Sequence, residues 1–377
     1  MISYLEGGAL VSNLFEYLMW RGDVNFNYAP LNELDSLIFA ELSYIPYDGM
    51  ISADLQTDGI SLLEVYEKNF EKRKEKIKVG AIFPEKLLTE LLKMAAKSNR
   101  FKNVKIRGYV NDIDLAHEKQ FSAMCFDITD DITYVVFRGT DDTIIGWKED
   151  LNMALFTPVP AQQEAVDYLN EVVRADKKRQ LYVGGHSKGG NLAVYSAFGA
   201  EKSIQDKIIS VHNFDGPGFR QDFTISANEN SSLVDRVFNY IPESAVIGSI
   251  FDTVGKRIYV KSTVRNGLFQ HDAFTWINDV TTLTRVEMLS KSSIQFHNSL
   301  EDLVSEMSAE ETADFVEAVY KICTANDSET LTDILSNKLK FINALVTADG
   351  KSKRSMWIGI KKIFKNSIFK KNKRSEK

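Results

Sequence analysis

Ser187 lies in the stretch Gly185-His186-Ser187-Lys188-Gly189, which follows a short apolar run and precedes a helix-like segment. Glycines weaken regular elements, so two of them placed symmetrically around one serine indicate a turn that admits only small residues. In the G-x-S-x-G pattern the serine occupies a strained turn between a strand and a helix, with its hydroxyl exposed. The stretch therefore predicts nucleophilic catalysis by Ser187. The alternative is a packing turn in which Ser187 only caps the helix.

A serine hydroxyl needs a general base within hydrogen-bond reach. In folds with this kind of turn the chain order is serine, acid, histidine, which leaves His212, His271 and His297. His271 follows a glycine in an expected loop, where catalytic groups on a rigid sheet tend to lie, and we favour it. His297 comes next, although its helical surroundings favour a structural role. His212 lies inside an apolar strand pattern and is expected to face the interface between layers.

The acid that orients the histidine has two candidates, each placed directly after an expected strand. Asp215 ends the run at 208–214 and precedes Gly-Pro-Gly, which marks a sharp turn. Glu243 follows the next strand, at 236–241. We favour Asp215 and keep Glu243 as the alternative acid. A turn-forming aspartate is the structural alternative for Asp215.

The negative oxygen of an acyl-transfer intermediate needs two hydrogen-bond donors. The backbone N–H of Lys188 is the first, because it begins the helix after the serine. The apolar strand that ends in Gly139 and Thr140 offers the second, through a backbone N–H or the Thr140 hydroxyl. We expect Arg138, just before them, to anchor structure.

Strand and helix patterns alternate between residues 101 and 300, which predicts a mostly parallel sheet with helices on both faces. The run at 131–140 is apolar without alternation, as in a strand that is buried on both faces. With Ser187 as nucleophile, the predicted fold class is the α/β-hydrolase fold. The expected strands cover residues 104–117, 119–129, 131–140, 181–185, 208–214, 236–241 and 257–263, and the expected helices residues 162–178 and 191–200.

The segments on either side of this core have helical patterns. Leucine and isoleucine recur at helical spacing in 31–45, and Pro84 is suited to the first turn of a second helix. Helices are expected again from about 283 to 347. The predicted division is a helical extension at 1–100 that could act as a cap or lid, an α/β-hydrolase core at 101–300, a helical segment at 301–350 and a basic amphipathic tail at 351–377.

The composition is typical of a soluble globular protein, with 44% hydrophobic and 26% charged residues. Two cysteines give neither a disulfide framework nor a thiol metal site, and we expect no metal and no cofactor. The first twenty residues have no basic region and include Glu6 and Glu16, so they do not resemble a secretory signal. Without about 18 uninterrupted apolar residues, a spanning helix is not expected. These features favour a cytoplasmic location.

The net charge of −6 is divided unevenly along the chain. Residues 351–377 hold eleven Lys or Arg and one acid, a net +10, which leaves −16 for the preceding 350 residues. An acidic body does not favour nucleic acid as a partner. In the tail, Trp357, Ile360, Phe364 and Ile368 share one helical face among cations. This pattern predicts contact of 352–377 with an anionic membrane surface, hence a peripheral position at the inner membrane face; docking on the acidic body and disorder are the alternatives.

Several motifs, taken in order, resemble a bacterial family of lipase-like α/β-hydrolases related to the class 3 (fungal-type) lipases. The resemblance spans roughly residues 10 to 290. It implies a triad of Ser187, Asp215 and His271, with Thr140 and Lys188 as oxyanion donors. The motifs that carry it are WRGDVNFNYAPLNELDSLIFAELSYI, VVFRGT, GWKEDL, GHSKGGNLA, NFDGPGF, YIPESAVIG and FQHDAFTW.

The chain departs from the class 3 lipases at two positions. Those lipases carry Gly-Ser-Pro where this chain has Asp215-Gly216-Pro217, and they take their acid from the next strand, nearest here to Glu243. Lys188 stands where they usually have leucine.

The predicted function is that of a serine hydrolase that cleaves carboxylic esters, with a hydrophobic acyl or lipid ester as the implied substrate. A thioesterase, an amidase or an acyltransferase would use the same triad. The alternative of another class is a non-catalytic, membrane-associated scaffold with this fold.

Overall fold

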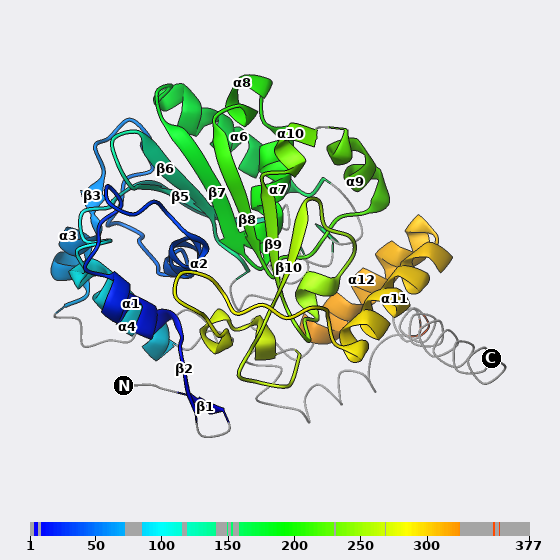
Figure 1. The fold of residues 1–377 in the computed structure, drawn as a ribbon. Helices are drawn as coiled ribbons and strands as arrows, with labels where there is room; N and C mark the ends of the chain where they lie inside the picture. Colours follow the sequence, from blue (N-terminus) through cyan, green and yellow to red (C-terminus); the bar gives the residue numbers. More distant parts are fainter. Residues whose placement is uncertain are drawn as a thin grey trace.

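The computed structural model describes residues 4–6, 9–71, 85–114, 119–140, 149, 152–153, 158–229, 231–267, 269–324, 350 and 354. Its centre is an eight-stranded sheet in the order β10-β9-β8-β7-β6-β5-β4-β3 (Figure 1). From β6 to β10 neighbouring strands are parallel, and from β3 to β6 they are antiparallel. The strands are β3 (Ile60–Ser61), β4 (Lys105–Asp114), β5 (Lys119–Asp127), β6 (Ile132–Phe137), β7 (Gln180–His186), β8 (Ile208–Phe214), β9 (Val237–Pro242) and β10 (Lys256–Val260).

Helices cover both faces of the sheet because its central strands are apolar on both sides. Along β5, Cys125 faces a core shared with α6 and α7, whereas Met124 and Phe126 face a core shared with α1 to α4. This confirms the predicted α/β-hydrolase class. The helices of these layers are α1 (Leu14–Arg21), α2 (Glu33–Leu42), α3 (Leu62–Asn69), α4 (Glu85–Lys97), α6 (Pro160–Ala175) and α7 (Lys188–Gly199).

Helix α2 is buried along nearly its whole length, from Leu34 to Leu42, and packs on β6, β7 and β8. Its N-terminus is fixed by Asp35, whose carboxylate receives Arg100 Nε at 2.7 Å and the Tyr17 hydroxyl at 2.7 Å. Both Asp35 and Arg100 are fully buried. These contacts hold the start of α2 against Tyr17 and Arg100, in the helix layer that packs on β7. The division of the chain into four segments, with a lid at its start, stays a prediction.

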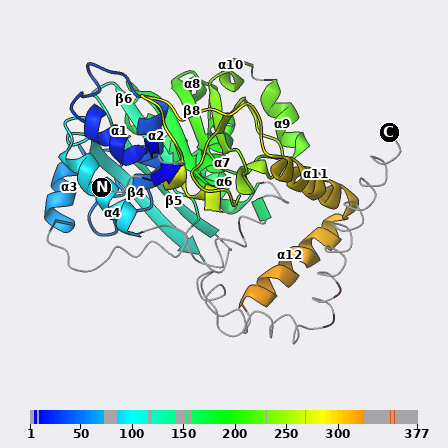
Figure 2. The ribbon, with the colours of Figure 1, turned by 60° about the horizontal axis from the view of Figure 1, so that its bottom comes forward.

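The remaining elements connect or extend this core. Residues 283–290 contain no helix, so the helical region expected from about 283 begins later, at Lys291. Helices α11 and α12 extend away from the sheet (Figures 1 and 2). The additional elements are β1 (Tyr4–Glu6), β2 (Ala9–Val11), α8 (Lys202–Gln205), α9 (Gln221–Asn228), α10 (Ser231–Val234), η1 (Ile247–Ser249), η2 (Phe269–His271), η3 (Ala273–Thr275), α11 (Lys291–Glu306) and α12 (Ala309–Thr324).

In the part of the chain that the structure describes, none of the helices combines the length and the hydrophobicity needed to span a membrane. Residues 325–349 and 355–377 lie outside that part, and so does most of the GWKEDL motif. The expected amphipathic helix of the tail is therefore a prediction that the described residues do not reach.

Candidate active site

Ser187 occupies the turn between β7 and α7 with φ 58° and ψ −133°, a backbone conformation that costs a non-glycine residue about 1–3 kcal/mol. The flanking glycines allow the turn to close. A Cβ on Gly185 would collide with the backbone of Gly189 and the carbonyl of Phe137, and a Cβ on Gly189 would meet the same carbonyl. The glycine spacing is thus a packing requirement of the strand, the turn and the helix.

Asp215 follows β8, the strand next to β7, and has a left-handed backbone with φ 50°. The Ser187 N–H donates to the carbonyl of Phe214 at 2.9 Å, which joins the ends of the two strands. One carboxylate oxygen of Asp215, Oδ1, accepts the backbone N–H of Gly248 at 3.0 Å. The Asp215 side chain is therefore fixed from a third segment, the turn after β9.

His271 reaches the same edge of the sheet from the loop after β10. Its Nδ1 lies 2.7 Å from Asp215 Oδ2. Because a carboxylate only accepts, Nδ1 carries the hydrogen and Nε2 is left as the acceptor on the opposite side of the ring. A histidine in this tautomer can take a proton from a hydroxyl.

Burial changes the proton affinity of both members of this pair. It lowers the pKa of His271 to about 4, so the imidazole is neutral at neutral pH, as a general base requires. Burial also raises the pKa of Asp215 well above its usual range, and the N–H of Gly248 opposes that rise. Paired titratable groups with shifted pKa values are typical of functional sites.

The other candidate residues lie elsewhere. Glu243 is half-buried after β9; its backbone N–H donates to Val260, and its carboxylate forms none of the described hydrogen bonds to His271. His297 Nδ1 donates to the carbonyl of Ser249 at 2.7 Å. His212 is buried in β8 with Nε2 at 2.7 Å from the Ser210 hydroxyl. The geometry therefore brings Asp215 to His271.

The expected oxyanion donors adjoin Ser187. A Cβ on Gly139 would lie 3.0 Å from the Cβ of Ser187, so the end of β6 packs directly against the serine, with the buried Thr140 next in the chain. Lys188 is the first residue of α7, and its N–H has no intrahelical acceptor. Both positions are compatible with donation to a substrate oxygen.

The Lys188 side chain points into the protein. Its Nζ lies 3.0 Å from Glu149 Oε2 and 2.8 Å from the carbonyl of Gln120, and both charged side chains are 1% exposed. Glu149 also accepts the backbone N–H groups of Gln120 and Ala161. Lysine replaces leucine here as half of an internal ion pair that anchors the start of α7. The acid in GWKEDL was the available sequence signal for this partner.

Sequence reasoning missed four residues at this edge: Glu41, Tyr44, His186 and Gly248. The signal for Glu41 was its place on the apolar stripe of α2, three residues after Ile38. In the sequence His186 is the variable residue before the serine of the G-x-S-x-G pattern, which carries no signal of its role. Its ring packs against that of His271, with ring centres 4.6 Å apart and the planes tilted by 33°. Gly248 contributes only its backbone N–H, and no pattern in the sequence indicates that role.

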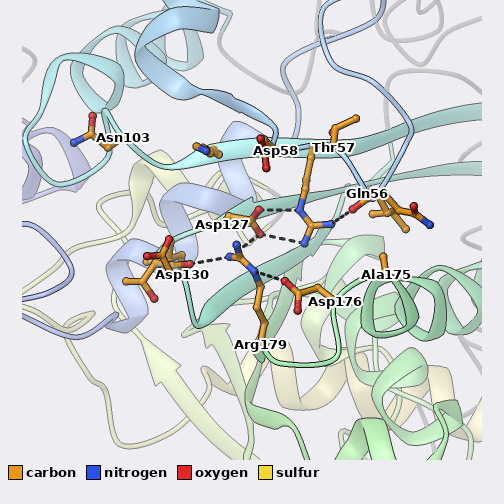
Figure 3. A pocket seen from close by; sticks show the side chains of 14 residues that line it. Gln56, Thr57, Asp58, Asn103, Asp127, Asp130, Ala175, Asp176 and Arg179 are labelled. Atoms are coloured by element: carbon orange, nitrogen blue, oxygen red, sulfur yellow. Dashed lines mark hydrogen bonds and ion pairs between the residues drawn. The ribbon is translucent and has the colours of Figure 1, made fainter.

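A polar cavity of about 520 Å³ opens at the other end of the sheet, where β5 ends and β7 begins. Arg107 Nε donates to Asp127 Oδ2 at 2.7 Å, and Arg179 donates to Asp176 at 2.9 Å. Figure 3 shows Arg179 extended toward Asp127 and Asp176. The two guanidinium groups are thus neutralised within the cavity wall. Among the described residues there is no cluster of three or more His, Cys, Asp or Glu side chains able to hold a metal ion.

Comparison with known proteins gives one family and several distant folds. The model of a family described as Mbeg1-like matches residues 95–321. No curated protein matches the sequence. Lipase II from Rhizopus niveus has 16% identity and TM-score 0.32 over 42% of this chain and 67% of its own. A triacylglycerol lipase from Penicillium expansum has 14% sequence identity and a TM-score of 0.34, over 49% of this chain and 74% of its own. The native Rhizomucor miehei lipase propeptide complex has 16% sequence identity and a TM-score of 0.33, over 60% of this chain and 69% of its own.

Proposed function

The chain belongs to the Mbeg1-like family, and we propose that it is a serine hydrolase that cleaves carboxylic esters through an acyl-enzyme. The observation that carries this proposal is the 2.7 Å contact between Asp215 and His271 at the edge of the sheet where Ser187 occupies its strained turn. A serine, a buried neutral imidazole and a carboxylate that fixes its tautomer are the parts that acyl transfer requires.

In the first half-reaction the Ser187 hydroxyl oxygen attacks the ester carbonyl carbon. His271 Nε2 takes the hydroxyl proton, and Asp215 retains its hydrogen bond to Nδ1 and stabilises the imidazolium. In this proposal the negative oxygen of the tetrahedral intermediate accepts the N–H of Lys188 and a donor from Thr140. Collapse breaks the carbon–oxygen bond to the alcohol, which leaves with the proton from His271.

In the second half-reaction water repeats these steps on the acyl-enzyme. His271 removes a proton from water, the resulting oxygen nucleophile attacks the acyl carbon, and the Ser187 oxygen leaves with that proton. The products are a carboxylic acid and the free serine. No other co-reactant is needed for this balance.

A hydrophobic acyl group is the proposed substrate feature. Phe269, two residues before His271, is 63% exposed, which supports an apolar approach to the histidine. A lipid ester satisfies this requirement, and the membrane contact of 352–377 remains part of the proposal. The cytoplasmic location and bacterial origin stay predictions from the sequence.

The test is hydrolysis of matched acyl esters, thioesters and amides by the wild-type protein and by Ser187→Ala. We expect ester hydrolysis by the wild type and its loss in the folded variant. If the wild type cleaves thioesters or amides faster than esters, the proposed substrate class is wrong, but Ser187 remains the proposed nucleophile. Equal rates for both proteins would contradict the proposal, and inactivity of the wild type on every substrate would favour the scaffold.

A further inference from the structure

His186 connects the triad to helix α2. It is fully buried at the end of β7, directly before Ser187. Its Nε2 lies 2.8 Å from the backbone carbonyl oxygen of His271, and its Nδ1 lies 3.0 Å from the hydroxyl of Tyr44. The rings of His186 and His271 are tilted by 33°. The His186 side chain thus contacts both the backbone carbonyl and the imidazole ring of His271.

These partners determine the tautomer of His186. The carbonyl oxygen of His271 can only accept, so Nε2 of His186 carries a hydrogen. In a neutral ring Nδ1 then accepts, and Tyr44 is its donor. Burial and the neighbouring His271 lower the pKa of His186 well below its usual range, which keeps the ring neutral. A neutral ring does not repel the positive charge that His271 acquires when it takes a proton.

Glu41 lies beside the Nδ1 edge of the His186 ring. Its Oε1 lies 3.8 Å from His186 Nδ1, and neither carboxyl oxygen has a hydrogen-bond partner among the described residues. Burial, and to a smaller extent Asp272, raises the pKa of Glu41 well above its usual range. The groups that face His186 include the Glu41 carboxyl, the Tyr44 hydroxyl, the imidazole of His271 and the indole of Trp276. A charged carboxylate here would favour a proton on His186.

We propose that His186, held in one tautomer by the His271 carbonyl and Tyr44, is a positioning residue that orients His271 toward Ser187. The hydrogen bond to the His271 carbonyl fixes the backbone of the loop, and the contact between the two tilted rings restricts the His271 imidazole. The hydrogen bond to Asp215 holds the His271 ring at a single atom, Nδ1. A ring held at one atom can still tilt, so a second contact is needed to fix its orientation. This role rests on the proposed serine hydrolysis, because it acts through the general base.

Three variants separate positioning from folding. His186→Phe keeps a ring and removes the N–H donor to His271. His186→Gln restores an amide donor of similar reach. Tyr44→Phe leaves His186 in place and removes the hydroxyl that lies 3.0 Å from its Nδ1. A misplacement of about 1 Å can cost roughly a hundredfold in rate.

We expect His186→Phe to lower kcat by about 10–100-fold and Tyr44→Phe by about 10-fold, with KM unchanged. His186→Gln should recover most of the loss. Unchanged kcat in His186→Phe and Tyr44→Phe, both folded, would overturn the proposal. If His186→Phe does not fold, Tyr44→Phe and His186→Gln decide the question, and an unchanged kcat in Tyr44→Phe overturns the proposal.

A second readout does not depend on hydrolysis. The Nδ1 proton of His271, held against Asp215, should give a resolved downfield proton NMR signal that Asp215→Asn removes. We expect this signal to persist in Ser187→Ala and His186→Gln, and to shift or broaden in His186→Phe. An unaltered signal in His186→Phe would contradict the positioning role. A wild-type protein with the predicted NMR changes and no hydrolysis would refute the proposed function and retain the orientation of His271.

Discussion

The two ends of the parallel strands differ in backbone strain and in the hydrogen bonding of their buried polar groups. At the amino end, Asp127 accepts from Arg107, Arg179 and Thr133, so the walls of the polar cavity are paired. At the carboxyl end, Ser187 has a strained backbone and Glu41 is buried without a hydrogen-bond partner among the described residues. The seven residues of β7 separate the two ends by about 20 Å.

The strained serine and the buried Glu41 lie at the end of the sheet opposite the polar cavity. Paired charges lower the cost of burial and stabilise the fold, whereas strain and unpaired buried groups persist where the surrounding structure enforces them. Under the proposed function, reactivity lies at the carboxyl end, and the paired charges at the amino end contribute to stability. Changes of similar chemistry at the two ends should have different effects.

The largest expected difference concerns the acid. Asp215→Asn should lower kcat by about 10⁴-fold, because an amide can hold the histidine in the wrong tautomer. Glu243→Gln is the matched control and should leave kcat within about twofold, since Glu243 forms none of the described hydrogen bonds to His271. The measurement is steady-state hydrolysis by folded variants. A larger loss in Glu243→Gln would move the acid to the strand that the class 3 lipases use.

At the opposite end, Asp127→Ala should reduce the free energy of unfolding by about 3–5 kcal/mol, because it leaves the buried Arg107 guanidinium uncompensated. Its kcat at a temperature where it is folded should match the wild type. Asp58→Ala, an exposed residue of the same cavity wall, should change stability by less than about 0.5 kcal/mol. Denaturant titrations and initial rates measure both effects. A stable Asp127→Ala protein that loses activity would contradict the separation of the two ends.

Two threonine hydroxyls give a smaller, matched comparison. Thr140→Val should lower kcat by about a hundredfold with little change in KM, because one lost oxyanion donor costs roughly 3 kcal/mol in the transition state. Thr133→Val removes the hydroxyl that donates to Asp127 at 2.7 Å and should lower stability by about 1 kcal/mol without changing kcat. If kcat is retained in Thr140→Val, the oxyanion contacts come from backbone N–H groups.

The smallest expected effect is a pH-dependent gain in stability in Glu41→Gln. In the unfolded chain a glutamate loses its proton near pH 4.5, whereas in the folded protein burial raises the pKa of Glu41, so its proton is lost at a higher pH. Above pH 4.5 the native state therefore binds more protons than the unfolded state, and stability falls as pH rises. Glutamine has no such cost, so its Tm should exceed that of the wild type by about 1–3 °C at pH 7.5 and match it at pH 4. A lower Tm at pH 7.5 would show that Glu41 is a stabilising carboxylate.

The sequence predicted features that depend on local spacing. The glycines around Ser187 are needed for contacts within one strand–turn–helix unit, so five consecutive residues contain the signal. The expected strands from 104 to 263 correspond to β4 through β10 because their apolar runs are buried in one sheet. The contact of Asp215 with His271 was predicted only as one of two alternatives, since 56 residues separate them.

Features that depend on distant contacts were missed. Tyr44 and His186 are 142 residues apart, and neither has a spacing that indicates the other. The helical period of 31–45 predicted α2, but a glutamate on an apolar stripe does not reveal which histidine it faces. Residues 283–290 were expected to be helical, yet they run beside β10, where Arg285 forms an isolated bridge to Val260 and the N–H of Val286 donates to the carbonyl of Tyr259 at 2.9 Å.

The most direct test of the account is the site of labelling by a fluorophosphonate probe, which forms a covalent bond with an activated serine. Intact mass measurement and peptide mapping should find one adduct, on Ser187. Labelling should be absent in Ser187→Ala, slow in Asp215→Asn and unchanged in rate in folded Asp127→Ala. Absence of labelling in the wild type, or an adduct that remains in Ser187→Ala, would contradict the assignment of nucleophilic chemistry to the carboxyl end of β7.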